Sequence, residues 1–175
     1  MEMKEFGGKA LFLDRNDINT DEIIPAKYLT ENTKDALKPH ILEDLHMEGF
    51  EAERDIVGKN IIVTRTNFGC GSSREHAVWV FEVNGINVVI AESFARIFRQ
   101  NMFNCGMLAV ELSKEDMDSL FFLGPETTIR VDMEHNLISA ENAAGKSLAI
   151  TFAMNEFDRE LVMAGGWLAY ADKKY

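Results

Sequence analysis

The residues best suited to chemistry are concentrated in the stretch NFGCGSSREHA, residues 67–77. Eight consecutive positions, 69–76, hold two glycines, a cysteine, two serines, an arginine, a glutamate and a histidine. A helix that begins here would offer free backbone N–H groups and about half a positive charge to an anion. Arg74 adds a guanidinium that can hold a carboxylate through two parallel hydrogen bonds. The stretch therefore indicates a site that binds a small carboxylic acid and could remove a proton from it.

The same residues also fit a purely structural interpretation. Ser72 and Glu75 have the spacing of a capping box, in which the serine is the N-cap and the glutamate is the third helical residue. This pattern is weakly specific, so a helix that begins near Ser72 would explain it without any function. A cap needs only one serine, whereas this stretch has two serines, a Gly-Cys-Gly approach and an arginine. Both interpretations therefore stay open.

Two named motifs fit the stretch poorly, and a catalytic cysteine is a further alternative. In a dinucleotide-binding fingerprint, Arg74 would occupy the place of the third glycine, which allows a helix to pack closely on a strand. A phosphate-binding P-loop needs Gly-Lys-Ser or Gly-Lys-Thr, which this stretch lacks. Cys70 near a helix start could be a nucleophile with a lowered pKa, but His76 need not face it on a helix. A catalytic cysteine is the less favoured hypothesis.

No metal site is predicted in this chain. Asp17, Asn19 and Asp21 have the spacing of a calcium loop, but Glu22 replaces its glycine and Tyr28 replaces its bidentate glutamate. The two cysteines, Cys70 and Cys105, are too few for a disulfide framework. They are also too few to hold a 4Fe–4S cluster, which usually needs several thiolates.

Length and charge limit the possible classes of function. A chain of 175 residues is expected to form a single domain over residues 1–175. The formal net charge of −11 would repel polyphosphates and anionic lipids, so neither nucleic acid nor a membrane is an expected partner. The first ten residues contain no apolar run, and the few cysteines suit a reducing compartment, so a cytoplasmic protein is expected.

Apolar patterns predict an α/β fold that is built on a mixed sheet. Strands are predicted over residues 9–13, 60–65, 86–91, 107–112, 127–131, 136–140 and 147–151. Helices are predicted over residues 33–45 with a break at Pro39, from near Ser72 to a stop at Gly85, over 93–106, after a cap at Ser113, and over 156–164. The alternation of strand and helix in the centre favours parallel strands, and the last third favours an antiparallel meander.

Three motifs together resemble the mobile swivel domain of the aconitase superfamily. They are DINTDEIIPAKYL at residues 17–29, GSSREH at residues 71–76 and SFARIF at residues 93–98. The resemblance covers nearly the whole chain in order, and the joint occurrence of the three motifs is highly specific. In its length and in its sequence GCGSS, the chain resembles the free-standing small subunits of isopropylmalate dehydratases within that superfamily. The resemblance implies a single swivelling β/β/α domain with a mixed parallel and antiparallel sheet flanked by helices.

The resemblance also implies roles for individual residues. Ser72 is expected to be the base that removes a proton from the carbon next to a carboxylate, and Asp21 is expected to be a second catalytic residue. Ser73 and Arg74 are expected to bind substrate, together with backbone groups of Gly71. A serine hydroxyl is a weak base in water. The backbone N–H groups of the Gly-Cys-Gly-Ser-Ser segment would therefore have to stabilise the Ser72 alkoxide.

The cofactor and the partner follow from the same resemblance. Family members remove water from a hydroxy-di- or tricarboxylic acid and add it back, and a 4Fe–4S cluster in a large subunit acts on the departing hydroxyl. This chain is therefore expected to bind no cluster alone and to be active only with its large subunit, as a heterodimer or a heterotetramer.

The substrate is expected to be a hydroxy-dicarboxylate with an alkyl group. The loop around Thr30 is implied to meet the substituent that distinguishes substrates, and relatives that accept a further carboxylate tend to place an arginine there. No arginine occurs between Arg15 and Arg54, which favours isopropylmalate or another alkylmalate over homocitrate or citrate. A related dehydratase, such as a homoaconitase or an alkylmalate dehydratase, stays an alternative. A non-catalytic module that binds an anionic metabolite is another.

Two further residues are ambiguous in the sequence. Arg96 within SFARIF could bind substrate, but an ordinary surface ion pair is the favoured interpretation, with Ser93 as a helix cap. His76 could support the site or lie on a helix surface, and the sequence favours neither.

Overall fold

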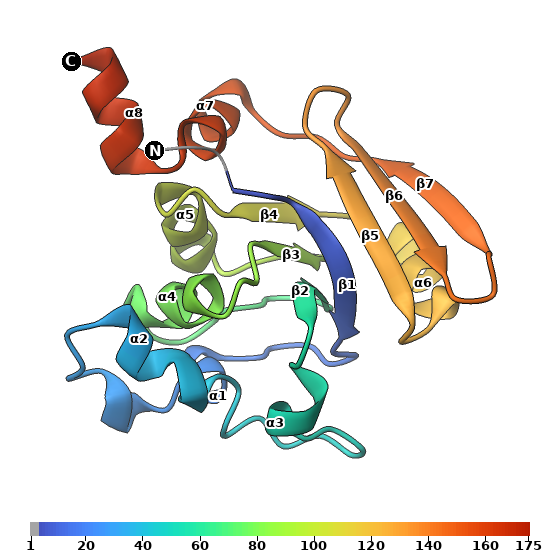
Figure 1. Ribbon diagram of the computed structural model, residues 1–175, viewed down its shortest axis with the longest axis horizontal. Coiled ribbons are helices and arrows are strands. Elements are labelled where there is room, and N and C mark those ends of the chain that lie inside the picture. Colours follow the sequence, from blue (N-terminus) through green and yellow to red (C-terminus); the bar gives the residue numbers. More distant parts are fainter. Residues whose placement is uncertain (1–3) are drawn as a thin grey trace.

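The computed structural model describes residues 4–175, and one seven-stranded sheet runs through them (Figure 1). The strands follow the spatial order β4-β3-β2-β1-β5-β6-β7. Their bounds are β1 Gly7–Phe12, β2 Lys59–Val63, β3 Val88–Ala91, β4 Leu108–Glu111, β5 Thr127–Asp132, β6 Leu137–Asn142 and β7 Ser147–Thr151. Each of the seven strands lies where the sequence predicts one.

Strands β1 to β4 form the parallel half of the sheet. Neighbouring pairs run parallel, for example with Leu11 beside Ile62 and Val89 beside Ala109. Every residue of β3 is buried. Apolar residues on both faces are expected where helices cover a parallel sheet.

Strands β5 to β7 form an antiparallel meander that is joined to the parallel half through β1. Buried Thr127 and Ile129 alternate along β5 with exposed Thr128 and Arg130, as expected when one face of a sheet is in water. The mixed α/β fold predicted from the sequence is therefore confirmed.

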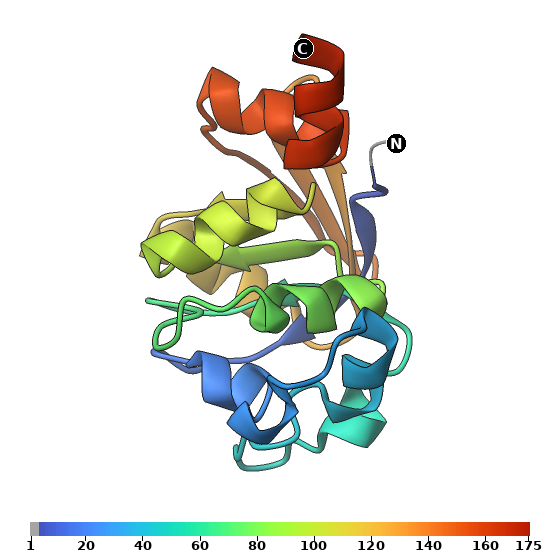
Figure 2. The same cartoon turned by 90° about the vertical axis from the view of Figure 1, so that its left-hand side faces the viewer.

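Most helices lie on one side of the parallel strands, and Figure 2 looks onto α4 and α5 on that side. Helix α6 instead packs against β6 and β7 (Figure 1). The bounds are α1 Thr20–Ile23, α2 Lys34–Leu37, α3 Ala52–Asp55, α4 His76–Val83, α5 Arg96–Asn104, α6 Lys114–Leu123, α7 Glu156–Ala164 and α8 Trp167–Lys174, with 3₁₀ turns at Ala26–Tyr28 and Lys38–His40.

Several helix signals in the sequence are confirmed. Ser113 caps α6 by accepting a hydrogen bond from the Asp116 N–H at 3.1 Å. Helix α7 has the predicted bounds and ends at Gly165, whose φ of 94° is left-handed. The break expected at Pro39 is the transition from α2 to the following 3₁₀ turn.

Three helices were not predicted, and the short helix α3 is one of them. Helix α8 follows Gly165 and Gly166 directly, where the sequence suggested only a stop. Helix α1 lies inside the segment expected to be an irregular polar loop. Asn19 and Glu22 form a reciprocal capping box around its first turn, which explains why so short and polar a helix forms.

A helix can cross a lipid bilayer only if it is long and apolar enough. Among residues 4–175, no helix is both long enough and apolar enough to cross a lipid bilayer.

Candidate active site

The three sequence motifs lie at one edge of the sheet. Residues 13–19 follow β1, residues 64–75 follow β2 and residues 92–95 follow β3. These strands are parallel neighbours, so their carboxyl ends lie side by side, which is where open α/β sheets bind ligands. Figure 2 shows the loops after β1 and β2 next to one another. Segments far apart in the sequence thus form one surface.

Backbone hydrogen bonds join the first two loops. The Gly69 N–H donates to the Ile18 carbonyl at 2.8 Å, and the Thr20 N–H donates to the Cys70 carbonyl at 2.8 Å. Nearer the strands, the Asp17 N–H donates to the Thr66 carbonyl at 2.9 Å. The segment that leads to Ser72 is therefore fixed along the segment that leads to Asp21.

The third loop is joined to the second through Phe68. The Phe68 N–H donates to the Ser93 carbonyl at 3.1 Å, and the Ala95 N–H donates to the Phe68 carbonyl at 2.9 Å. The prediction that Ser93 caps a helix is wrong, because α5 begins at Arg96 with Ala95 as its N-cap. The Ser93 hydroxyl instead accepts a hydrogen bond from the Asn67 N–H at 2.8 Å, which strengthens the contact between the loops.

Two glycines let the loops approach this closely. Gly69 has φ +83°, and a Cβ there would lie 2.2 Å from the Phe98 ring. Gly71 has φ +109°, and a Cβ there would lie 3.0 Å from Thr20 Oγ1. Any other residue would clash or strain the backbone at these positions, so both glycines of the Gly-Cys-Gly sequence are required by shape.

Ser72 does not cap the helix that follows it, so the predicted capping box is wrong. Helix α4 begins at His76, and its N-cap Glu75 makes no side-chain capping bond. The Ser72 N–H instead donates to the buried Thr20 hydroxyl oxygen at 2.9 Å, which holds the chain against α1 rather than in a helix. The Ser72 hydroxyl oxygen accepts a hydrogen bond from the Arg74 N–H at 3.3 Å. Ser72 is thus exposed, with its backbone anchored and its hydroxyl beside an N–H donor.

Ser72 lines two hollows in the surface. One is a small cavity of about 10 Å³ that is lined by Thr20, Asp21, Ser72 and Arg74, together with apolar residues. The other is a hollow of about 540 Å³ that is lined by Gly71, Ser72 and Ser73 and by the start of α5, including Arg96. The fold therefore brings the predicted catalytic and substrate-binding residues together, except Thr30.

Thr30 is exposed and lines neither hollow. Its neighbour Leu29 lines the cavity that contains Ser72. The His76 ring nitrogen Nε2 lies 3.3 Å from the Glu31 carbonyl oxygen, which ties this loop to the first turn of α4. His76 therefore supports the loop around Thr30 rather than pointing freely into solvent.

Two arginines at the site have no acidic partner among the residues that the structure describes. Neither Arg74 nor Arg96 makes an ion pair with any residue between positions 4 and 175. The surface ion pair favoured for Arg96 from the sequence is thus not found in this part of the chain. Both residues are exposed, so their guanidinium groups are accessible to an anionic ligand.

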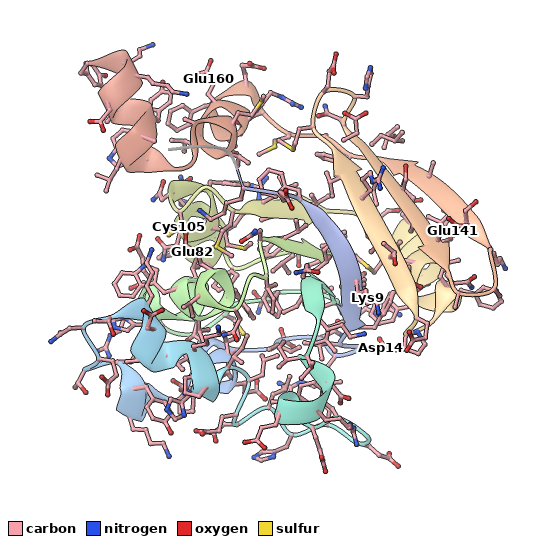
Figure 3. The ribbon with its side chains drawn as sticks, viewed as in Figure 1. Lys9, Asp14, Glu82, Cys105, Glu141 and Glu160 are labelled. Atoms are coloured by element: carbon pink, nitrogen blue, oxygen red, sulfur yellow. The ribbon has the colours of Figure 1, made fainter. Side chains whose placement is uncertain are left out.

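Both cysteines have raised pKa values. Burial raises the pKa of Cys70, and the negative charges of Asp17 and Glu22 raise it further. Burial, with the nearby carboxylates of Glu82 and Glu75, raises the pKa of Cys105 to about 12. Figure 3 labels Cys105 and Glu82 near one another between α5 and α4. A thiolate is disfavoured at both positions, which argues against a catalytic cysteine.

The thiols also do not fit an iron–sulfur cluster, because such clusters bind thiolates. Within residues 4–175, no three histidine, cysteine, aspartate or glutamate side chains gather in a way that could hold a metal ion.

The sequence interpretation missed two residues that build the site. Thr20 holds the Ser72 N–H, and its position beside Asp21 was the available signal. Asn101 on α5 donates to the Ser73 carbonyl at 3.1 Å. The polar face of α5, with Arg96, Gln100 and Asn101 opposite the buried Phe98 and Met102, could have indicated this contact.

Comparison with known proteins agrees with this architecture. The family model of the aconitase C-terminal domain matches residues 4–115. A 3-isopropylmalate dehydratase small subunit from Pseudoalteromonas translucida is 34% identical over 171 residues, covering 91% of this chain and 84% of that protein. A 3-isopropylmalate dehydratase small subunit 2 from Deinococcus radiodurans is 40% identical over 156 residues, covering 89% of this chain and 71% of that protein.

A solved structure agrees as well. The crystal structure of a 3-isopropylmalate dehydratase (LeuD) from Methanocaldococcus jannaschii superposes with a TM-score of 0.76 at 30% identity. The match covers 96% of this chain and 93% of that chain. The resemblance drawn from the three motifs is thus confirmed, and the chain belongs to the aconitase C-terminal domain family, among the small subunits of 3-isopropylmalate dehydratases.

Proposed function

We propose that this chain is the small subunit of a 3-isopropylmalate dehydratase, a hydro-lyase of leucine biosynthesis. It would convert 2-isopropylmalate to 3-isopropylmalate by removing water and adding it back at the neighbouring carbon. The observation that carries the proposal is the gathering of Asp21, Ser72 and Arg74 around one cavity. They gather in a chain that matches such small subunits over most of their length.

Ser72 acts as the base in this proposal. Its oxygen takes the proton from the carbon next to a carboxylate, the C–H electron pair forms the double bond, and the hydroxyl leaves the adjacent carbon with its bonding electrons. Water then adds back across the double bond, with its hydroxyl on the carbon that lost the proton, and this gives the isomer. The Arg74 N–H, 3.3 Å from Ser72 Oγ, supports negative charge on that oxygen.

Arg74, Ser73 and Gly71 bind the substrate in this proposal. The exposed Arg74 guanidinium can pair with the carboxylate whose neighbouring carbon loses its proton. Asn101 holds the Ser73 carbonyl, which fixes the backbone from Gly71 to Arg74. Asp21 lines the same cavity as Ser72, where its carboxylate can exchange a proton during the two halves of the reaction.

The remaining half of the site is assigned to a cluster-bearing large subunit. Its 4Fe–4S cluster would supply a Lewis acid for the departing hydroxyl. The residues of this chain bind the substrate and move its proton. Ser72, Ser73 and Arg74 are exposed, as groups that face a substrate held between two chains must be.

Reconstitution with a large subunit tests the proposal. This chain is combined anaerobically with a candidate large subunit, iron and sulfide, and the unsaturated intermediate is followed from 2-isopropylmalate. Ser72→Ala should lower kcat by about a hundredfold or more, because it removes the base. Undiminished activity of Ser72→Ala would disprove the base assignment. Tight binding of the acid without turnover by any partner would favour the non-catalytic module.

A further inference from the structure

Arg65 lies at the meeting point of three carboxylates. Its Nε is 2.7 Å from Asp14 Oδ1, and its Nη1 is 2.6 Å from Asp118 Oδ1 and 3.5 Å from Glu92 Oε2. The guanidinium also lies over the Phe121 ring, 4.1 Å from its centroid. Only 15% of the Arg65 side chain is exposed. These contacts hold it in one orientation.

Arg65 and two of its acidic partners lie at the ends of three neighbouring strands. Asp14 lies just after β1, Arg65 just after β2, and Glu92 directly after β3. Figure 3 labels Asp14 at this end of β1. One guanidinium therefore joins the bases of all three loops that form the candidate active site. Asp118, by contrast, lies on α6 and belongs to none of these loops.

Hydrogen bonds connect this cluster to the reacting residues. Next to Arg65, the Thr64 hydroxyl donates to the Leu13 carbonyl at 2.9 Å, and the Glu92 N–H donates to the Arg65 carbonyl at 3.1 Å. The same number of residues separates Asp14 from Asp21 as separates Arg65 from Ser72. A contact that fixes Asp14 beside Arg65 therefore also favours the register in which Asp21 lies near Ser72.

Charge makes this role specific to arginine. Burial by itself would lower the pKa of Arg65, but hydrogen bonds to Asp14 and Asp118 outweigh it and raise the pKa. Without Arg65, the carboxylates of Asp14 and Glu92 would repel one another and push the loops apart. Asp118, by contrast, would keep its ion pair with Lys114 at 3.1 Å. A lysine ammonium lacks the planar fork that reaches several carboxylates in fixed directions.

We propose that Arg65 is a positioning residue for the dehydration, because it holds the three loops in the register that places Ser72 and Asp21 at one cavity. This inference rests on the proposed function. Arg65 itself touches no substrate and acts through the loops that it joins.

The first test compares Arg65→Met with Asp118→Asn in the reconstituted complex. Methionine keeps an apolar stem over Phe121 and removes the charge, whereas Asp118→Asn weakens the contact to α6 and leaves the loop contacts in place. Arg65→Met should lower kcat by about tenfold to a hundredfold, with KM changed by less than about threefold, because the reacting groups are misplaced. Asp118→Asn should leave both kcat and KM within about twofold.

A second measurement uses the isolated full-length chain and does not depend on activity. Amide hydrogen exchange at Gly69, Thr20 and Ser72 should become about tenfold faster or more in Arg65→Met and stay unchanged in Asp118→Asn. Arg65→Lys should restore little of this protection. Equal losses in both variants, in proportion to their melting temperatures, would overturn the proposal. Unchanged exchange at these amides would overturn it as well, even if the chain proved inactive with every large subunit.

Discussion

The backbone N–H of Ser72 donates a 2.9 Å hydrogen bond to the side-chain oxygen of Thr20, the residue directly before Asp21. Two segments that are more than fifty residues apart in the sequence are thereby joined at the point where the proposed base and the proposed second catalytic residue lie. Thr20 is 5% exposed, so this contact belongs to the protein interior.

Replacing this hydroxyl should reduce activity more than stability. Thr20→Val keeps the side-chain shape but leaves the Ser72 N–H without its acceptor, at a cost of about 1 kcal/mol in stability. We expect kcat to fall by about tenfold because Ser72 is displaced. Urea unfolding and steady-state kinetics of the reconstituted enzyme measure the two effects.

Thr127→Val is the matched control for this prediction. Thr127 is 1% exposed, and its hydroxyl donates to the Gly124 carbonyl at 2.7 Å, on the antiparallel part of the sheet. Its loss of stability should be similar, with kcat unchanged. If the two variants lost activity equally, the Thr20 contact would be merely structural.

Thr30→Arg should move substrate preference toward acids with a further carboxylate. The loop around Thr30 carries no arginine, so a distal carboxylate would lack a bidentate partner there. We expect the ratio of kcat/KM for homocitrate to that for 2-isopropylmalate to rise by about tenfold or more. Thr128→Arg, at an exposed position on β5, controls for added charge. An unchanged ratio would show that this loop does not select the substrate.

Both thiols should react slowly with alkylating reagents at neutral pH. The raised pKa of Cys70 and the pKa of about 12 for Cys105 leave little thiolate at pH 7. Mass spectrometry after iodoacetamide treatment should show less modification of either residue than of glutathione, increasing as pH rises. Rapid labelling of Cys70 at pH 7, together with loss of activity in Cys70→Ala, would instead support the catalytic-cysteine hypothesis.

Glu22 should contribute to stability only above acidic pH. Burial by itself would raise its pKa, but hydrogen bonds from the Arg15 side chain and the Asn19 N–H lower the pKa below its usual 4.5. A carboxyl whose pKa is lower in the folded state stabilises the protein above pH 4.5, and the effect is lost as pH falls through the folded pKa. Glu22→Gln should therefore lower the urea midpoint at pH 7.

Lowering the pH should remove the difference in urea midpoint between Glu22→Gln and the unsubstituted chain. The midpoints of Glu22→Gln and the unsubstituted chain should converge below pH 4.5 as the native glutamate becomes protonated. A difference of constant size from pH 7 down to pH 3 would mean that the charge of Glu22 does not stabilise α1.

Several features of this protein follow from the sequence alone. The seven strands, the Ser113 cap and the stop of α7 at Gly165 depend on local patterns and on backbone preferences of single residues. The three motifs likewise carry the family in their residue types and order. Ser72, Ser73, Arg74 and Asp21 could therefore be named before their positions were known.

The tertiary structure decided how these residues meet. The strand order places the loops after β1, β2 and β3 side by side, and neither periodicity nor spacing specifies which strands become neighbours. The sequence predicted a helix from Ser72, but the Thr20 hydrogen bond and the left-handed turn at Gly71 delay the helix until His76. The roles of Thr20, Asn101 and Arg65 depend on contacts across the chain, which local preferences do not encode. Local interactions determined the elements, and long-range packing and charge determined the site.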